Sequence, residues 1–103
     1  NNNNHHYCLL LKNVQLLHLQ NCSNMIDISL LGAIPTLYII SCDDLVDISG
    51  LGKGNRYVKI VLCSKIKDVS SLCNVPRVTI VKCANIQNLS VLANVPRLKV
   101  TLL

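Results

Sequence analysis

The chain has 103 residues, half of them hydrophobic and 3% aromatic, with a formal net charge of +5 from ten Lys and Arg against five acidic residues. This length allows one small domain, and the hydrophobic content excludes intrinsic disorder. Three tyrosines stand against no Phe and no Trp, which disfavours an ordinary compact core anchored by large rings. No apolar stretch approaches the roughly 18 residues needed to span a bilayer, so we expect no membrane insertion.

The N-terminal segment 1–10 differs in composition from the rest of the chain. It opens with four Asn and two His, and it lacks the basic region and the apolar core of a signal peptide. We assign it to a low-complexity, partly disordered segment. The grouping of His5, His6 and Cys8 leaves a metal site there as an alternative, but we predict none.

From residue 11 onward, the chain repeats one unit with a period of 20 or 21 residues. A cysteine marks the period, and the four cysteines are Cys22, Cys42, Cys63 and Cys83. A serine follows each cysteine after seven residues, at Ser29, Ser49, Ser70 and Ser90. Two residues before each serine is an Asp or Asn, at Asp27, Asp47, Asp68 and Asn88. Because one such unit cannot bury its own apolar side, the repeat predicts stacked coils around a continuous apolar column.

Within each unit, we expect a short strand, a one-turn helix and a return to the next strand, in that order. The strand is indicated by alternating apolar residues before each cysteine, at Leu17/Leu19, Leu37/Ile39, Val58/Ile60 and Val78/Ile80. The serine is predicted to be the N-cap of the helix. A proline then ends three of the four units, at Pro35, Pro76 and Pro96. Strands of successive coils would pair in parallel, about 4.8 Å apart.

These units, such as LHLQNCSNMIDISLLGAIP and VTIVKCANIQNLSVLANVP, resemble leucine-rich repeats. They are most similar to the short internalin-like type, with cysteine in the slot that the family fills with Asn or Cys. The resemblance implies an α/β-type repeat solenoid, a right-handed coil with a parallel β-sheet on its concave face. Short turns or 3-10 helix would lie on the convex face. It also implies a non-enzymatic protein, since members of the family bind other macromolecules, usually proteins, through the concave face.

The resemblance covers residues 11–103, which we predict to be one leucine-rich-repeat domain. Its parts are a partial first repeat 11–16, the repeats 17–36, 37–57, 58–77 and 78–97, and a final strand 98–103. Because no polar cap is recognisable at either end, we expect a section of a longer array. In the second repeat, Gly52-Lys53-Gly54-Asn55 replaces the usual ending and adds one residue, so a looser convex turn is expected there.

The repeated cysteines are predicted to be structural. Metal sites need close pairs such as C-x-x-C, and thiols on stacked layers suit disulfide geometry poorly. A small apolar side chain whose S–H reaches a nearby carbonyl fits the pattern better. Free buried thiols favour a reducing compartment, so we expect an intracellular, cytoplasmic location.

No catalytic residue and no cofactor are predicted. The Asp ladder follows the repeat, which favours hydrogen bonds to the turn backbone over paired catalytic carboxylates. The glycines of 50–54 lack the spacing of a phosphate-binding loop, and no helix of useful length follows them.

Functional residues are expected on the exposed face of the sheet, where the repeat leaves residue types free. Strand alternation places these side chains there: Leu16, His18, Gln20, Thr36, Tyr38, Ile40, Tyr57, Lys59, Val61, Arg77, Thr79, Val81, Arg97, Lys99 and Thr101. The predicted partner-binding residues among them are Tyr38, Ile40, Tyr57, Lys59, Arg77, Arg97 and Lys99. An apolar patch flanked by Arg is typical of protein-binding hot spots.

We therefore predict a protein-interaction scaffold or module that is part of a larger chain or assembly. One alternative is a structural element that assembles edge to edge through its terminal strands. Another is nucleic-acid or polyanion binding through the basic stripe, which the few stacking aromatics disfavour. A solvated face without a partner is the remaining alternative.

Overall fold

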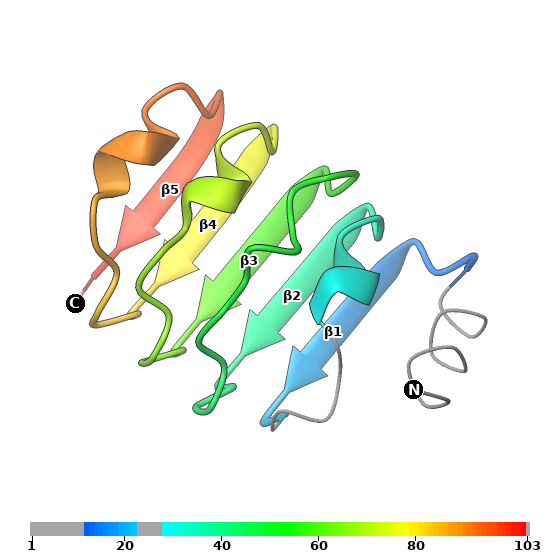
Figure 1. Cartoon of the computed structure of the whole chain (residues 1–103), viewed down its shortest axis with the longest axis horizontal. Coiled ribbons are helices and arrows are strands. Elements are labelled where there is room, and N and C mark those ends of the chain that lie inside the picture. The colour runs from blue at the N-terminus through cyan, green and yellow to red at the C-terminus, as the bar shows by residue number, and fades with distance from the viewer. Residues whose placement is uncertain (1–11, 23–27, 103) are drawn as a thin grey trace.

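A computed structural model of the chain describes residues 12–22 and 28–102. Its strands are β1 (Leu16–Gln20), β2 (Thr36–Ile40), β3 (Tyr57–Val61), β4 (Arg77–Val81) and β5 (Arg97–Thr101). They form one open sheet in the order β1-β2-β3-β4-β5, and every neighbouring pair is parallel (Figure 1). The predicted strands and their parallel pairing are confirmed, and each strand preceded by a proline begins at the next residue.

The connections between the strands lie together on one side of the sheet (Figure 1). They include three 3-10 helices, η1 (Ile28–Leu31), η2 (Ser70–Leu72) and η3 (Leu89–Leu92). We call this side the connection layer. Among the described residues, no helix is long and apolar enough to cross a bilayer.

The prediction that serine is the N-cap is wrong. In η2, Val69 holds the N-cap position without a side-chain capping bond, and Ser70 is the first residue of the helix. The Asp two residues before the serine accepts the backbone N–H of the serine itself: Oδ1 of Asp68 lies 2.8 Å from the backbone N of Ser70. Asp47 accepts the backbone N–H of Ser49 at the same distance. The predicted role of these two carboxylates in the turn backbone is therefore confirmed, whereas Asp27 lies outside the described residues.

The core lies between the sheet and the connection layer. The strands contribute their inward residues, which are fully buried in the middle of the sheet, at Leu37, Ile39, Val58, Ile60, Val78 and Ile80. The connections contribute Leu31, Leu72, Leu92 and the apolar residue before proline, such as Val75. Each fully buried Leu, Ile or Val contributes about 1.5–3 kcal/mol relative to exposure, so this column is the main source of stability.

The cysteines line one edge of this column, as predicted. Cys42, Cys63 and Cys83 are buried, and each Sγ points at the carbonyl oxygen two residues earlier, at 3.6, 3.4 and 3.5 Å respectively. Cys83 also approaches the carbonyl of Ile60 in the preceding strand, at 3.6 Å. All the described cysteines are free thiols, and Cys8 lies outside the described residues. Burial raises the pKa of Cys63 to about 11 and also raises the pKa of Cys42 and Cys83.

The residue before each of the four repeated cysteines, Cys22, Cys42, Cys63 and Cys83, has a left-handed backbone. The four residues are Asn21, Ser41, Leu62 and Lys82, with φ between 53° and 55°. Each N–H donates to the last carbonyl of the next strand; for example, the N of Leu62 lies 2.9 Å from the O of Val81. Non-glycine residues adopt this conformation at a cost in free energy. Here the hydrogen bond to the next strand and the burial of the following cysteine offset that cost.

The second connection absorbs the one extra residue of its repeat. It has no 3-10 helix, but it is not loose, because the side chain of Asn55 is 4% exposed and fixes it. Nδ2 of Asn55 donates to the carbonyls of Leu31 and Ile34 at 3.0 and 2.6 Å, and Oδ1 accepts the N–H of Gly52 at 2.8 Å. Gly52 has a φ of 101°, and a Cβ there would lie 2.0 Å from the carbonyl oxygen of Ser71. The expected looser turn is therefore replaced by one held through buried hydrogen bonds.

Candidate functional site

The face of the sheet opposite the connection layer carries the outward side chains of all five strands, and we call it the open face. The strand register arranges these side chains in three rows that cross the strands. The first row is Leu16, Thr36, Tyr57, Arg77 and Arg97. The second is His18, Tyr38, Lys59, Thr79 and Lys99, and the third is Gln20, Ile40, Val61, Val81 and Thr101.

All seven predicted partner-binding residues lie on the open face. Four of them are partly buried by their neighbours, namely Tyr38, Ile40, Tyr57 and Lys59. The other three are exposed, namely Arg77, Arg97 and Lys99. The predicted alternation is confirmed, since the strand residues between these positions point toward the core.

Aromatic rings contact one another across the first three strands. The rings of His18 and Tyr38 are 6.1 Å apart at an interplanar angle of 76°, and those of Tyr38 and Tyr57 are 5.5 Å apart at 80°. These edge-to-face arrangements match the electrostatic preference of aromatic pairs. The three side chains therefore form a continuous ladder rather than separate rings in solvent.

Cationic side chains cover the two tyrosine rings. Nζ of Lys59 lies 5.7 Å from the ring centre of Tyr38, and Cζ of Arg77 lies 4.0 Å from that of Tyr57. The hydroxyl of Tyr57 also hydrogen-bonds Oγ1 of Thr79, at 3.1 Å. Cation–π contacts at exposed positions contribute about 0.5–1 kcal/mol each, so they favour this arrangement of the side chains.

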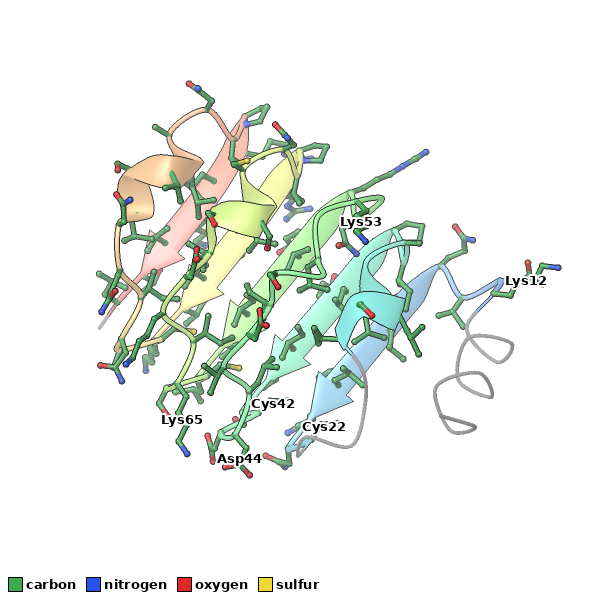
Figure 2. The ribbon with its side chains drawn as sticks, in the orientation of Figure 1. Lys12, Cys22, Cys42, Asp44, Lys53 and Lys65 are labelled. Atoms are coloured by element: carbon green, nitrogen blue, oxygen red, sulfur yellow. The ribbon has the colours of Figure 1, made fainter. Side chains whose placement is uncertain are left out.

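The described acidic residues lie only in the connections, whereas cations lie both there and on the open face. The strands carry four cations on the open face, Lys59, Arg77, Arg97 and Lys99, and no acidic residue. The described acidic residues are Asp43, Asp44, Asp47 and Asp68, all exposed in the connections. Figure 2 shows Asp44 beside Lys65 where the strands end, and their side chains form an exposed ion pair at 3.7 Å.

The two connection-layer carboxylates that bind backbone have lowered pKa values. The pKa of Asp47 is lowered mainly by the backbone N–H of Ser49, and that of Asp68 mainly by the hydroxyl of Ser70 together with its N–H. Both carboxylates are thus committed to their own turns, which favours a structural role over general acid–base chemistry.

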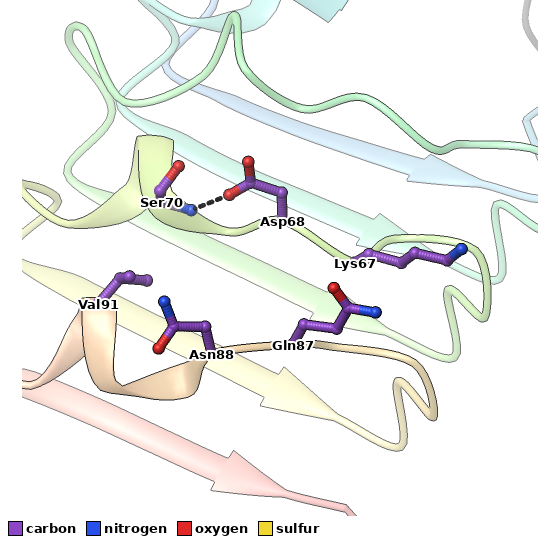
Figure 3. Close-up of a pocket in the computed structure, with 6 residues that line it drawn as sticks. All are labelled: Lys67, Asp68, Ser70, Gln87, Asn88 and Val91. Carbon is purple, nitrogen blue, oxygen red and sulfur yellow. Dashed lines mark hydrogen bonds between the residues drawn. The ribbon is translucent and has the colours of Figure 1, made fainter.

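A hollow of about 370 Å³ lies in the connection layer between η2 and η3 (Figure 3). It is lined by Lys67, Asp68, Ser70, Gln87, Asn88 and Val91. Its one carboxylate accepts the N–H of Ser70, as Figure 3 shows, and the polar lining residues are exposed. In the part of the chain that the structure describes, no group of three His, Cys, Asp or Glu is placed to hold a metal ion.

Sequence reasoning missed the contacts that order the open face. Strand alternation places His18 and Thr79 on this face but does not mark them as site residues, although His18 extends the aromatic ladder and Thr79 hydrogen-bonds Tyr57. For His18 the signal was the repeat itself, because His18 and Tyr38 are one period apart and become register neighbours. The contact of Thr79 with Tyr57 is diagonal, since Thr79 pairs with Lys59 in the register, and the repeat does not indicate it. Comparison of the chain with family models, curated proteins and solved structures finds no match.

Proposed function

We propose that the chain is a leucine-rich-repeat segment that acts as a non-enzymatic protein-binding module within a larger chain or assembly. Three observations support the family assignment: the period of 20 or 21 residues, the parallel strands in matched register, and the buried cysteine that follows each of β2, β3 and β4. In this family the open face corresponds to the concave face.

The observation that carries the proposal is the ordered set of tyrosines and cations on the open face. Tyr and Arg dominate binding hot spots because they combine a large apolar surface with polar groups. Here Tyr38, Tyr57 and Arg77 are held by neighbours from adjacent strands. Side chains that are ordered before binding lose less conformational entropy on association. We assign Tyr38, Tyr57 and Ile40 to the apolar centre, and Lys59, Arg77, Arg97 and Lys99 to polar contacts.

The proposal is tested with a random-peptide display library selected on the full chain. The selected peptides are then measured against a face variant, Arg77→Glu/Arg97→Glu, and a control variant, Lys53→Glu/Lys67→Glu. Both variants replace two exposed cations, but the control changes only the connection layer. We expect the face variant to weaken binding about tenfold or more, and the control to leave it unchanged. If every selected peptide binds the two variants equally well, the proposal is wrong.

Self-association through β5 is the second candidate function. Leu98 lies on the core side of β5 and is 38% exposed, whereas its register neighbour Val78 is fully buried. A second copy that packed against this strand would bury Leu98 and satisfy the outer backbone groups. Light scattering over a range of concentrations tests this candidate, with Leu98→Lys as the variant that should dissociate any assembly. A chain that stays monomeric throughout argues against it.

A further inference from the structure

We infer that the partner of the open face is an acidic protein segment in which carboxylates lie to one side of an apolar side chain. This inference rests on the proposed function and adds the charge and layout of the partner. It follows from how the open face divides into two halves.

The aromatic half consists of His18, Tyr38 and Tyr57, on β1 to β3. The cationic half consists of Lys59, Arg77, Arg97 and Lys99, on β3 to β5. Lys59 and Arg77 join the halves, because each also covers a tyrosine ring. A partner that crosses the strands therefore meets rings first and cations next.

The cationic half lacks an internal counter-charge. Arg77 and Arg97 are direct register neighbours, and Lys59 and Lys99 are separated by Thr79 in the next row. Among the described residues, no Asp or Glu forms an ion pair with these four cations, whereas Lys65 does pair with Asp44 in the connection layer. Like charges on neighbouring strands repel each other. Carboxylates of a partner would remove this repulsion and accept hydrogen bonds from the two guanidinium groups.

The strand spacing sets the layout of the partner. Strands lie about 4.8 Å apart, so Tyr38 on β2 and Arg77 on β4 are about 10 Å apart across the sheet. An extended peptide advances about 3.3 Å per residue. Because successive side chains of an extended peptide point to opposite faces, an apolar side chain on the aromatic half would be followed by a carboxylate on the cationic half two or four residues later, about 7 or 13 Å along the peptide.

A peptide fits this face better than a single-stranded nucleic acid. Bases bind such proteins by stacking on free aromatic faces. Here the rings of Tyr38 and Tyr57 meet edge to face, and Lys59 and Arg77 lie over them. A carboxylate needs only the cations, and an apolar side chain can pack against the ring edges and Ile40.

The test uses displayed libraries of peptides of about twelve residues, enough to cross the sheet in extended or helical form. The libraries share the same apolar and neutral residues and differ in one class: Asp and Glu, Asn and Gln, or Lys and Arg. Each is selected on the full chain and measured against Arg77→Gln/Arg97→Gln, with Lys53→Gln/Lys67→Gln as the control that removes the same charge. We expect only the acidic library to yield enriched peptides. These peptides should bind the face variant about tenfold more weakly than the original chain, and they should bind the control variant with unchanged affinity.

The remaining outcomes separate this inference from the proposed function. Tyr38→Ser reports binding to the open face independently of charge. If Asn and Gln peptides bind as tightly and lose affinity with Tyr38→Ser, the acidic partner is wrong while the protein-binding function stands. If no library yields a peptide sensitive to Tyr38→Ser or to the face variant, both are wrong. If a single-stranded oligonucleotide of about 16 nucleotides displaces the acidic peptides and binds more tightly, the partner is a nucleic acid instead.

Discussion

The guanidinium carbon of Arg77 lies 4.0 Å above the ring centre of Tyr57, while the hydroxyl of the same ring bonds Oγ1 of Thr79 at 3.1 Å. Both contacts come from β4, so the orientation of a β3 side chain is set by the next strand. Two residues on that strand therefore position the centre of the open face.

The contact between Arg77 and Tyr57 should be measurable as a coupling free energy. We expect a double-mutant cycle with Tyr57→Leu and Arg77→Gln to give about 0.5–1 kcal/mol, the range of exposed cation–π pairs. The measurement is the free energy of unfolding in urea. Arg97 has no ring contact in the described structure. The changes in the free energy of unfolding caused by Arg97→Gln and Tyr57→Leu should therefore be additive within about 0.5 kcal/mol. Equal coupling in both cycles would contradict the assignment.

Replacing Asn55 should destabilise the chain strongly. Asn55→Ala leaves the carbonyls of Leu31 and Ile34 and the N–H of Gly52 without their partner. Since each buried unsatisfied group costs about 1–3 kcal/mol, we expect a loss of about 3 kcal/mol in the free energy of unfolding. Asn55→Asp should also destabilise, because a carboxylate cannot donate to the carbonyls. Asn74→Ala, at an exposed position, is the control and should change stability by less than about 0.5 kcal/mol.

The left-handed residues offer a stabilising substitution. Leu62 has a φ of 55° and is 46% exposed, whereas the equivalent position in the first unit is Asn21. Asn tolerates this backbone better than Leu, so Leu62→Asn should raise the free energy of unfolding by about 1 kcal/mol. Asn21→Leu should lower it by a similar amount. Changes of the same sign at both positions would contradict the explanation.

Alkaline pH should destabilise the chain through the buried thiols. Burial raises the pKa of Cys63 from 9.0 to about 11, so between these values the folded state binds more protons than the unfolded state. The stabilisation is complete below pH 9 and is lost as the pH rises toward 11. Urea midpoints should therefore fall from pH 8 to about pH 10. The urea midpoint of the Cys63→Ala variant should fall less steeply over this interval. If its slope with pH equals that of the original chain, the buried Cys63 thiol is not the cause of the alkaline destabilisation.

The sequence was sufficient to predict what the period controls. Alternation and a repeat of 20 or 21 residues place each strand and its register, because equivalent residues of successive units lie side by side. It failed at the start of the helix. The helix begins at Ser70 itself, so the N–H of Ser70 has no partner within the helix and Asp68 accepts it. The N–H groups of Leu72 and Cys73 donate to the carbonyls of Val69 and Ser70. The contacts of Tyr57 and Asn55 depend on side-chain orientation, which the pattern of residue types does not contain.

The second connection also shows where this chain accommodates a change of length. Residues 36 and 57 are 21 positions apart yet pair in the same register as residues 16 and 36, which are 20 apart. The extra residue is taken up around Gly52 and Asn55, on the far side of the sheet from the tyrosines. Lys53, exposed in the same turn (Figure 2), is thus a position for a fluorescent label or a surface tether that leaves the open face undisturbed.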